Sequence, residues 1–340
     1  MMNMIIFPPT IDWSWMRQRP QQLAKQLAKR GYTVFYCNQS TQKKPVEEMM
    51  PRLYVVHHFS KWVREEYPRL KQTEGNVIGL WCTWPKLTPY IKKMKPDWVI
   101  YDCVDEMERW QRYEPEMVKR SNAIICTSQP LFERLRKDYP FKRIEIVRNG
   151  YDPDLSLHLE HASSILPRDL PKNNRPLVGY VGAWAPWIDE ELVRRLLREK
   201  IDLVVIGTEF GLNYCSYGKS NMHFLGHKAH EQLANYLPFF HVCIIPFQKN
   251  KLTAAVNPVK AYEYLAAGKP VVSTNLPECR QMYPYVEIGH SHDEFVSKVL
   301  HYIHHAGDAS DRIRYALQHT WDHRGEQIEA IIKEFTHFKR

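Results

Sequence analysis

The sequence predicts an α/β protein with two parallel-sheet domains, and three observations support this prediction. Short apolar runs alternate with helical segments over the first 150 residues, and the alternation starts again at residue 177. A stretch rich in Ser, Pro, Lys and Asn separates the two series and is typical of an exposed linker. Continuous apolar strands between helices indicate parallel sheets covered on both faces. We therefore expect a first domain at residues 1–155, a linker at 156–176 and a second domain at 177–319.

The first domain is expected to open with a strand, a helix and a second strand. An apolar stripe identifies the helix at residues 17–31, which Pro20 opens and Gly31 ends. The predicted strands of this domain are Met4–Phe7, Thr33–Cys37, Leu53–Val56, Val77–Cys82, Trp98–Tyr101, Ala123–Cys126 and Ile144–Val147.

The second domain repeats the alternation. Its predicted strands are Leu177–Val181, Leu203–Gly207, Met222–Leu225, Val242–Pro246, Val271–Thr274 and Val286–Ile288. Helices are expected at Asp189–Arg198, His230–Leu237 and His292–His305, and the tail from about residue 309 is expected to be helical, with Trp321 as an anchor.

The segment Asn257–Val272 is predicted to form a short helix, a glycine stop and a buried strand. Pro258 suits a first helical turn, and Gly268 supplies the left-handed residue that ends the helix. Lys260 and Glu263 are three residues apart, so they share one face near the helix N-terminus, where free amides favour an anion such as a diphosphate. A surface Lys–Glu pair on an ordinary crossover helix is the alternative.

The pattern N-P-x-K-x-x-E-Y-x-A-A-G-K-P-V-V at residues 257–272 resembles the donor-site signature of GT-B glycosyltransferases, in particular the retaining family 4. The resemblance implies two Rossmann-like parallel-sheet domains facing across a cleft, with a C-terminal helix at about 320–340 packing back on the first. It also implies that Glu263 binds the donor ribose and that Asn257, Lys260 and Tyr262 belong to the same site. Ala255 occupies the position of a second family glutamate, so half of that motif is missing.

Gly182, Ala183 and Trp184 follow the first strand of the second domain. Glycines at a strand end let backbone amides approach a phosphate, although a tight strand–helix turn needs glycine as well. A dinucleotide-binding fingerprint is not supported, because G-x-G-x-x-G is absent. The resemblance places these three residues in the donor site.

Asp102 and Asp105 lie at the end of a predicted strand of the first domain, where open α/β sheets bind ligands. A carboxylate there can accept a proton from an acceptor hydroxyl, so we take both as candidate catalytic residues. A helix-capping aspartate is the alternative for either one.

The loop after the first strand combines aromatic, acidic and basic side chains. Aromatic rings stack on sugar faces, and arginines bind phosphate through two hydrogen bonds. The W-x-x-x-R-Q-R-P-Q-Q-L run that begins at residue 13 resembles the first loop of bacterial glycosyltransferases of the teichuronic acid type. A plain interface loop is the alternative. The expected acceptor-binding residues are Asp12, Trp13, Trp15, Arg17 and Arg19.

The formal net charge of +9 favours an anionic partner. Nucleic acid is not expected, because no recognised binding motif is present. An anionic membrane surface is expected to attract the basic residues of the first helix, Arg17, Arg19, Lys25, Lys29 and Arg30. No apolar run is long enough to cross a bilayer, and the N-terminus lacks a signal-peptide core. We therefore expect a cytoplasmic protein with peripheral attachment at the inner membrane face.

Neither a cofactor nor a metal ion is expected. The seven cysteines are scattered, with no C-x-x-C pair, and several lie in apolar runs, so reduced core thiols are favoured over disulfides or zinc. No D-x-D pair follows a strand in the second half. The lysine and the helix amides would supply the positive charge that Mg²⁺ supplies elsewhere.

We interpret the chain as a glycosyltransferase that moves a sugar from a UDP- or GDP-sugar to a cell-wall or surface glycan, which is lipid-linked or free. The reaction is expected to be metal-independent and, by the resemblance, retaining. A non-catalytic GT-B-like protein that binds a sugar nucleotide or serves as a scaffold is the alternative. A nicotinamide oxidoreductase, the third possibility, lacks its glycine fingerprint.

Overall fold

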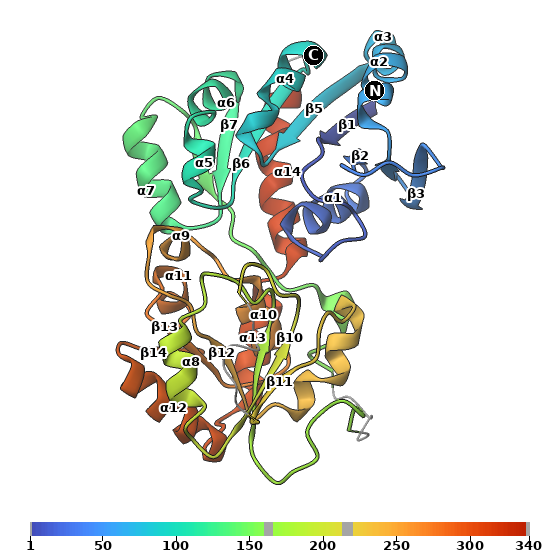
Figure 1. Cartoon of the computed structure of the whole chain (residues 1–340). Coiled ribbons are helices and arrows are strands. Elements are labelled where there is room, and N and C mark those ends of the chain that lie inside the picture. Colours follow the sequence, from blue (N-terminus) through green and yellow to red (C-terminus); the bar gives the residue numbers. More distant parts are fainter. Residues whose placement is uncertain (1, 160–165, 213–219, 338–340) are drawn as a thin grey trace. The chain divides into compact units, whose positions relative to one another are not determined.

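The computed structural model describes residues 2–159, 166–212 and 220–337 (Figure 1). The chain forms two compact units, which are described separately. Unit 1 comprises Met1–Asn149 and Trp321–Arg340, and unit 2 comprises Gly150–Thr320. No helix of the described residues has the length and apolar content needed to cross a membrane.

Unit 1 is built on an eight-stranded sheet in the order β3-β4-β2-β1-β5-β6-β7-β8. Every neighbouring pair is parallel except β3 and β4, so β3 forms an antiparallel edge. The strands are β1 (Met2–Phe7), β2 (Thr33–Cys37), β3 (Val46–Met50), β4 (Leu53–Val56), β5 (Asn76–Cys82), β6 (Trp98–Cys103), β7 (Ala123–Cys126) and β8 (Ile144–Ile146).

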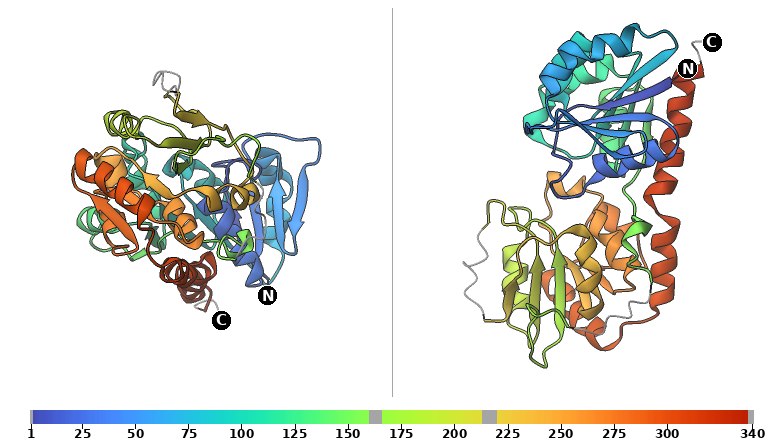
Figure 2. Two further views of the ribbon diagram at one scale, coloured as in Figure 1. Left: turned by 90° about the horizontal axis from the view of Figure 1, so that it is seen from below. Right: turned by 90° about the vertical axis from the view of Figure 1, so that its right-hand side faces the viewer.

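The helices of unit 1 connect these strands, and one of them comes from the end of the chain. They are α1 (Arg19–Lys29), α2 (Phe59–Glu65), α3 (Tyr67–Gln72), η1 (Pro85–Leu87), α4 (Thr88–Met94), α5 (Glu108–Gln111), α6 (Glu114–Arg120), α7 (Gln129–Asp138) and α14 (Trp321–His337). Helix α14 packs against α1 (Figure 2). Ile328 and Ile332 of α14 are fully buried, and Arg30 after α1 pairs with Asp322.

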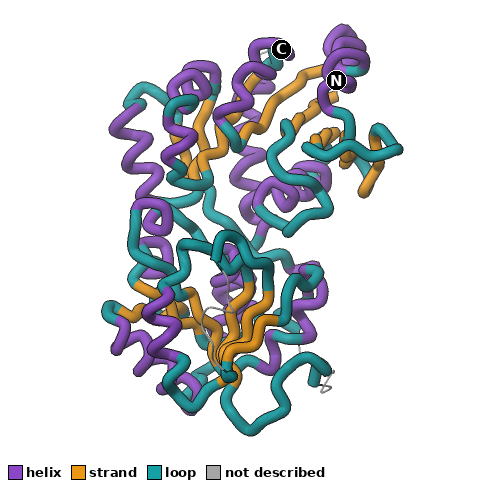
Figure 3. Tube along the Cα trace, in the orientation of Figure 1, coloured by secondary structure: helices purple, strands orange, loops and turns teal. Residues whose placement is uncertain are grey.

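Unit 2 has a six-stranded, fully parallel sheet in the order β11-β10-β9-β12-β13-β14. Its strands lie side by side between helices (Figure 3). They are β9 (Leu177–Val181), β10 (Asp202–Ile206), β11 (Met222–Phe224), β12 (Val242–Ile245), β13 (Val271–Thr274) and β14 (Val286–Gly289). Their apolar side chains form one core with the surrounding helices.

The helices of unit 2 include the predicted donor-site helix, α10. They are η2 (Pro153–Leu155), α8 (Glu190–Leu196), η4 (His230–Asn235), η5 (Leu237–Phe239), α9 (Lys251–Ala254), α10 (Val259–Ala266), α11 (Pro277–Arg280), α12 (His292–His304) and α13 (Ala309–Gln318). Gly268 ends α10 with φ +68°, as predicted. Pro258 occupies the N-cap position, just before the first turn in which it was expected.

Several local expectations differ from the structure. The described residues of the expected linker, 156–176, belong to unit 2, because Leu157 and Leu170 are buried in its core. The expected helix at His230–Leu237 consists of two 3-10 turns. The helical tail is broken at His319, whose carbonyl accepts a hydrogen bond from the Tyr151 amide. Six cysteines are free and buried, as predicted, and Cys215 lies outside the described residues.

Candidate functional site

The candidate donor site lies in unit 2 at the point where its strand order reverses. The chain passes from β9 outward to β10 and β11, and then returns to place β12 on the other side of β9. Open parallel sheets bind ligands at such a point, beyond the carboxyl ends of the strands. Gly182 directly follows β9, Phe247 follows β12, and α10 begins between β12 and β13.

Gly182 leaves room for the side chain of Lys260. Its φ is +138°, and a Cβ built on it would lie 2.5 Å from the Lys260 Nζ. A Cβ on Gly207, at the end of β10, would overlap the carbonyl oxygen of Gly182, so the two strand ends touch. The amide of Gly182 donates to the Ile206 carbonyl at 2.8 Å, so this amide already has a partner. The glycine that we expected at the donor site therefore serves by making space for the lysine.

Lys260 places its ammonium group against two aromatic rings. Its Nζ lies 4.0 Å from the centre of the Tyr180 ring and 4.9 Å from that of Phe247. Burial in this apolar surrounding lowers the pKa of Lys260 to about 7, although the negative charge of Glu263 acts in the opposite direction. A phosphate group arriving here would restore the charged form.

Glu263 is held by a histidine that the sequence did not reveal. The carboxylate is 7% exposed, and its Oε1 lies 2.7 Å from the Nε2 of His230. His230 begins η4, so it reaches α10 from an element 33 residues earlier in the chain. No spacing or motif linked these two residues. The pair fixes one carboxylate oxygen of the residue that was expected to bind the donor ribose.

Asn257 and Tyr262 are buried beside each other at the N-terminal part of α10. Asn257 is 3% exposed, and its Nδ2 donates to Glu278 at 2.8 Å and to the Tyr262 hydroxyl at 3.3 Å. Tyr262 is 1% exposed, so both residues act inside the unit. Glu278 of α11, fully buried, was not predicted from the sequence. Ala255, at the position of the missing family glutamate, is itself buried.

Ala183 and Trp184 occupy different environments. Trp184 is fully buried and meets the Tyr180 ring edge-on at 5.5 Å between ring centres. Its amide donates to the Thr208 carbonyl at 2.8 Å, which ties the turn after β9 to the turn after β10. The carbonyl of Ala183 accepts a hydrogen bond from the Tyr180 hydroxyl. Trp184 thus packs in the core, and its ring does not form the wall of an open pocket.

In unit 1, Asp102 is part of a buried ion pair. It is fully buried in β6, and both carboxylate oxygens lie within 3.0 Å of the Arg19 Nε. The Trp81 indole donates to the same carboxylate at 3.1 Å. Arg19, itself 4% exposed, also donates to the Arg148 carbonyl. Both partners therefore hold α1 against the sheet, and neither side chain is exposed to an acceptor.

Asp105 lies in the loop after β6 and is only partly buried. Burial, assisted by the negative charge of Asp102, raises the pKa of Asp105 to about 6. A carboxyl group with such a pKa can exchange a proton near neutral pH. Of the two predicted catalytic carboxylates, Asp105 is the one that is not fully buried.

The predicted acceptor loop contains both structural and exposed side chains. Asp12 accepts hydrogen bonds from the amides of Gln39 and Ser40; partial burial opposes ionisation, but these bonds prevail and lower its pKa. Trp13 meets Tyr36 edge-on, whereas Trp15 is 58% exposed. Arg17 is partly buried. Trp15 is therefore the exposed aromatic side chain of this loop. Among the described residues, no group of three or more His, Cys, Asp or Glu side chains could hold a metal ion.

Comparisons with known proteins bear on the fold and the family resemblance. Residues 186–330 match the family described as glycosyl transferase-like. The chain is 26% identical over 249 residues to a Bacillus subtilis protein named as a teichuronic acid biosynthesis glycosyltransferase, TuaH. That match covers 64% of this chain and 62% of the relative, so the chain spans less than two thirds of the relative's length.

Solved structures share the fold over the whole chain. Sucrose-phosphate synthase from Thermosynechococcus elongatus has a TM-score of 0.76 at 14% identity, with 99% of both chains covered. Anabaena HepE in complex with UDP and glucose has a TM-score of 0.70 at 12% identity, covering 98% of this chain and all of the other. The predicted GT-B fold is thereby confirmed, as is the predicted resemblance to glycosyltransferases of the teichuronic acid type.

Proposed function

We propose that this chain, which has the GT-B fold and resembles a teichuronic acid glycosyltransferase, is itself a glycosyltransferase that uses a UDP- or GDP-sugar as donor. The convergence of Gly182, Lys260 and Glu263 at the strand-order reversal of unit 2 carries the proposal. An ammonium group and a carboxylate one helical turn apart match the diphosphate and the ribose of such a donor.

Each of these residues has a distinct role in the proposed reaction. Lys260 and the first amides of α10 neutralise the charge that grows on the diphosphate as it leaves the sugar. Glu263 accepts hydrogen bonds from ribose hydroxyls, and His230 holds its carboxylate in place. Lysine and helix amides supply the positive charge, so we propose a metal-independent reaction, and the resemblance suggests a retaining outcome.

Unit 1 is proposed to bind the acceptor, a cell-wall or surface glycan that is free or lipid-linked. The exposed Trp15 offers a stacking surface, and Asp105 offers a carboxylate that can take the proton of the attacking hydroxyl. The similarity to TuaH supports this class of acceptor. A cytoplasmic location with attachment at the inner membrane face would suit a lipid-linked acceptor.

A non-catalytic protein that binds sugar nucleotides is the second candidate. It is favoured by Ala255, a buried methyl group where the family signature has a glutamate. Such a protein would bind the donor as firmly as an enzyme does and leave it intact.

Thermal unfolding with a panel of nucleotide sugars tests donor binding. A ligand that binds the folded state raises stability by RT ln(1 + [L]/Kd), so a true donor raises Tm more than its nucleoside does.

Glu263→Gln should weaken the binding of UDP and of intact donor alike, by about 1.5–3 kcal/mol, because it removes a charged hydrogen bond made to both. An unchanged affinity in a folded variant would contradict the assignment. Release of UDP from a bound donor, with or without acceptor, separates the enzyme from the non-catalytic binder.

A further inference from the structure

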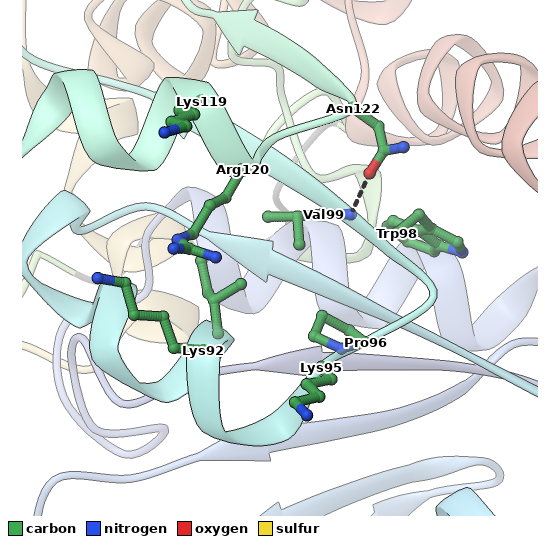
Figure 4. A pocket seen from close by; sticks show the side chains of 9 residues that line it. Lys92, Lys95, Pro96, Trp98, Val99, Lys119, Arg120 and Asn122 are labelled. Carbon is green, nitrogen blue, oxygen red and sulfur yellow. Dashed lines mark hydrogen bonds between the residues drawn. The ribbon is translucent and has the colours of Figure 1, made fainter.

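Unit 1 carries a hollow that lies away from its candidate catalytic residues. It encloses about 650 Å³ and is lined by Ile91, Lys92, Lys95, Pro96, Trp98, Val99, Lys119, Arg120 and Asn122 (Figure 4). We call this hollow the basic pocket. Its floor consists of the buried side chains of Ile91, Trp98 and Val99, and its rim carries four cationic side chains.

The basic pocket and Asp102 lie at opposite ends of the same strand. Trp98 and Val99 begin β6, whereas Asp102 stands near its end. At 3.3 Å per residue, Trp98 and Asp102 are separated by roughly 13 Å along the strand. The basic pocket is therefore a separate site, on the amino-terminal edge of the sheet.

The rim already holds one carboxylate oxygen between two cations. The Nζ of Lys92 lies 3.1 Å from the Glu116 Oε1, and an Nη of Arg120 lies 2.8 Å from the same atom. Their hydrogen bonds lower the pKa of Glu116, with those of Arg120 having the largest effect. Two further cations, Lys95 and Lys119, have no carboxylate partner among the residues that the structure describes. Four cations thus face one carboxylate, which leaves the rim strongly positive.

Helix stability alone does not account for this grouping. Lys92 and Lys119 lie in the last turns of α4 and α6, where a cation favours the helix dipole. That effect acts on each helix separately, and it gives no reason for both helix ends to converge on one hollow with Lys95 and Arg120 beside them. An external anion with several oxygens would supply the negative charge that Lys95 and Lys119 lack.

We propose that the basic pocket binds phosphate groups, with the headgroups of an anionic membrane as their source. The apolar floor below a cationic rim suits an amphiphile whose phosphate stays at the rim. Two of the five basic residues expected at a membrane are already paired within the protein, Arg19 with Asp102 and Arg30 with Asp322. The proposal does not depend on sugar transfer, so it can fail or succeed independently of the proposed function.

Co-sedimentation with phosphatidylglycerol and phosphatidylcholine vesicles tests the proposal on the full chain. The triple variant Lys95→Gln/Lys119→Gln/Arg120→Gln should bind phosphatidylglycerol vesicles more weakly, by about fivefold for each charge removed. Binding of the unaltered protein should also weaken as salt rises. The matched control removes three exposed lysines elsewhere, with Lys137→Gln/Lys172→Gln/Lys200→Gln, and should retain most of the binding.

A second arm distinguishes the source of the phosphate. Titration of the same three proteins with inorganic pyrophosphate, followed by NMR shifts of the pocket residues, reports binding without a membrane. Loss of pyrophosphate binding in the triple variant, with no vesicle binding by any protein, would support a phosphate site that serves a soluble ligand. Equal behaviour of the triple variant and its control in both arms would overturn the proposal. Affinity for UDP should stay the same in all three proteins.

Discussion

The protonation state of the Lys260 side chain should depend on whether a diphosphate is bound beside it. Its pKa of about 7 in the free protein, lowered by burial, means that it is half protonated near neutral pH. A bound diphosphate favours the ammonium form, so nucleotide binding should take up a proton. We expect Kd for UDP to rise by about tenfold per pH unit between pH 7.5 and 9, above the range in which the phosphate itself titrates.

Calorimetry in buffers with different ionisation enthalpies measures this proton uptake directly. Lys260→Met should bind UDP weakly and with no pH dependence. The same substitution should raise the unfolding free energy at pH 7. Folding lowers the pKa of Lys260, so the folded state disfavours its ammonium form, whereas the unfolded chain carries that charge up to about pH 10. An affinity of the unaltered protein that stays constant between pH 7.5 and 9 would contradict this role for Lys260.

Substitution of Asp102 or Arg19 should lower the stability of the fold, because the two side chains form a buried ion pair. Asp102→Asn leaves the Arg19 guanidinium buried without its carboxylate, so we expect the unfolding free energy in urea to fall by about 3–5 kcal/mol. The double variant Arg19→Met/Asp102→Leu removes both charges and should be more stable than Asp102→Asn. A stable Asp102→Asn protein that has lost transfer activity would instead return Asp102 to the catalytic candidates.

Asp105 should affect the rate of the proposed sugar transfer. With a pKa of about 6, it is ionised at neutral pH and becomes protonated below it. If it accepts the proton of the attacking hydroxyl, kcat/KM should fall by about tenfold per pH unit below pH 6. Asp105→Asn should abolish this step without lowering stability, because folding already disfavours the charged form. A folded variant with the original pH–rate profile would exclude Asp105.

At the scale of elements, a substitution in the turn after β9 should reduce the affinity for UDP, because this turn makes room for Lys260 of α10. Gly182→Ala would place a methyl group 2.5 Å from the Lys260 Nζ and should weaken UDP binding by at least tenfold. Gly226→Ala is the matched control, because Gly226 also has a positive φ but has no atom within 4 Å of the added Cβ. Gly226→Ala therefore reports the effect of an alanine at positive φ without the contact to Lys260. Equal UDP affinities would show that Lys260 does not need this space.

Buried elements with strong local signals were predictable from the sequence. Strands β2, β4, β7, β9 and β13 begin and end where predicted, since each is a short, largely buried run rich in apolar residues. The edge strand β3 was missed because its side chains are exposed or half-buried and carry no apolar pattern. The four-residue helix α11, which brings Glu278 beneath Asn257, is too short to have a period.

The candidate site was only partly predictable, because the sequence shows local motifs but not contacts between distant residues. Lys260 and Glu263 stand close together in one signature, and Gly182 was found at its strand end. The contacts that decide their chemistry join distant residues: His230 to Glu263 across 33 positions, and Arg19 to Asp102 across 83. Such pairs form only because the order of the strands brings distant residues together. The burial of Arg19 on Asp102 therefore could not be read from the sequence, which left an acceptor role open for Arg19.

At the scale of the whole molecule, the source of positive charge in the reaction can be tested without any mutation. We expect transfer activity to persist in excess EDTA, because Lys260 and the α10 amides would do the work of a divalent cation. The control is the same assay with added Mg²⁺ or Mn²⁺, which should change the rate little. Complete loss in EDTA that Mn²⁺ restores would rule out the proposed mechanism.

The pairing of Tyr151 with Thr320 has a consequence for the order in which a growing chain can fold. These residues are the second and the last of unit 2, and the Tyr151 amide donates to His319 at 2.9 Å. The sequence of unit 1 is therefore interrupted by about 170 residues, and α14 is synthesised after the whole of unit 2. Closing a flexible loop of that length costs about 4–5 kcal/mol of chain entropy. Unit 2, which is continuous, can fold first and bring residue 320 back beside residue 151, so that α14 reaches α1 with most of that entropy already lost. A chain truncated after residue 320 would thus contain all of unit 2 and an incomplete unit 1.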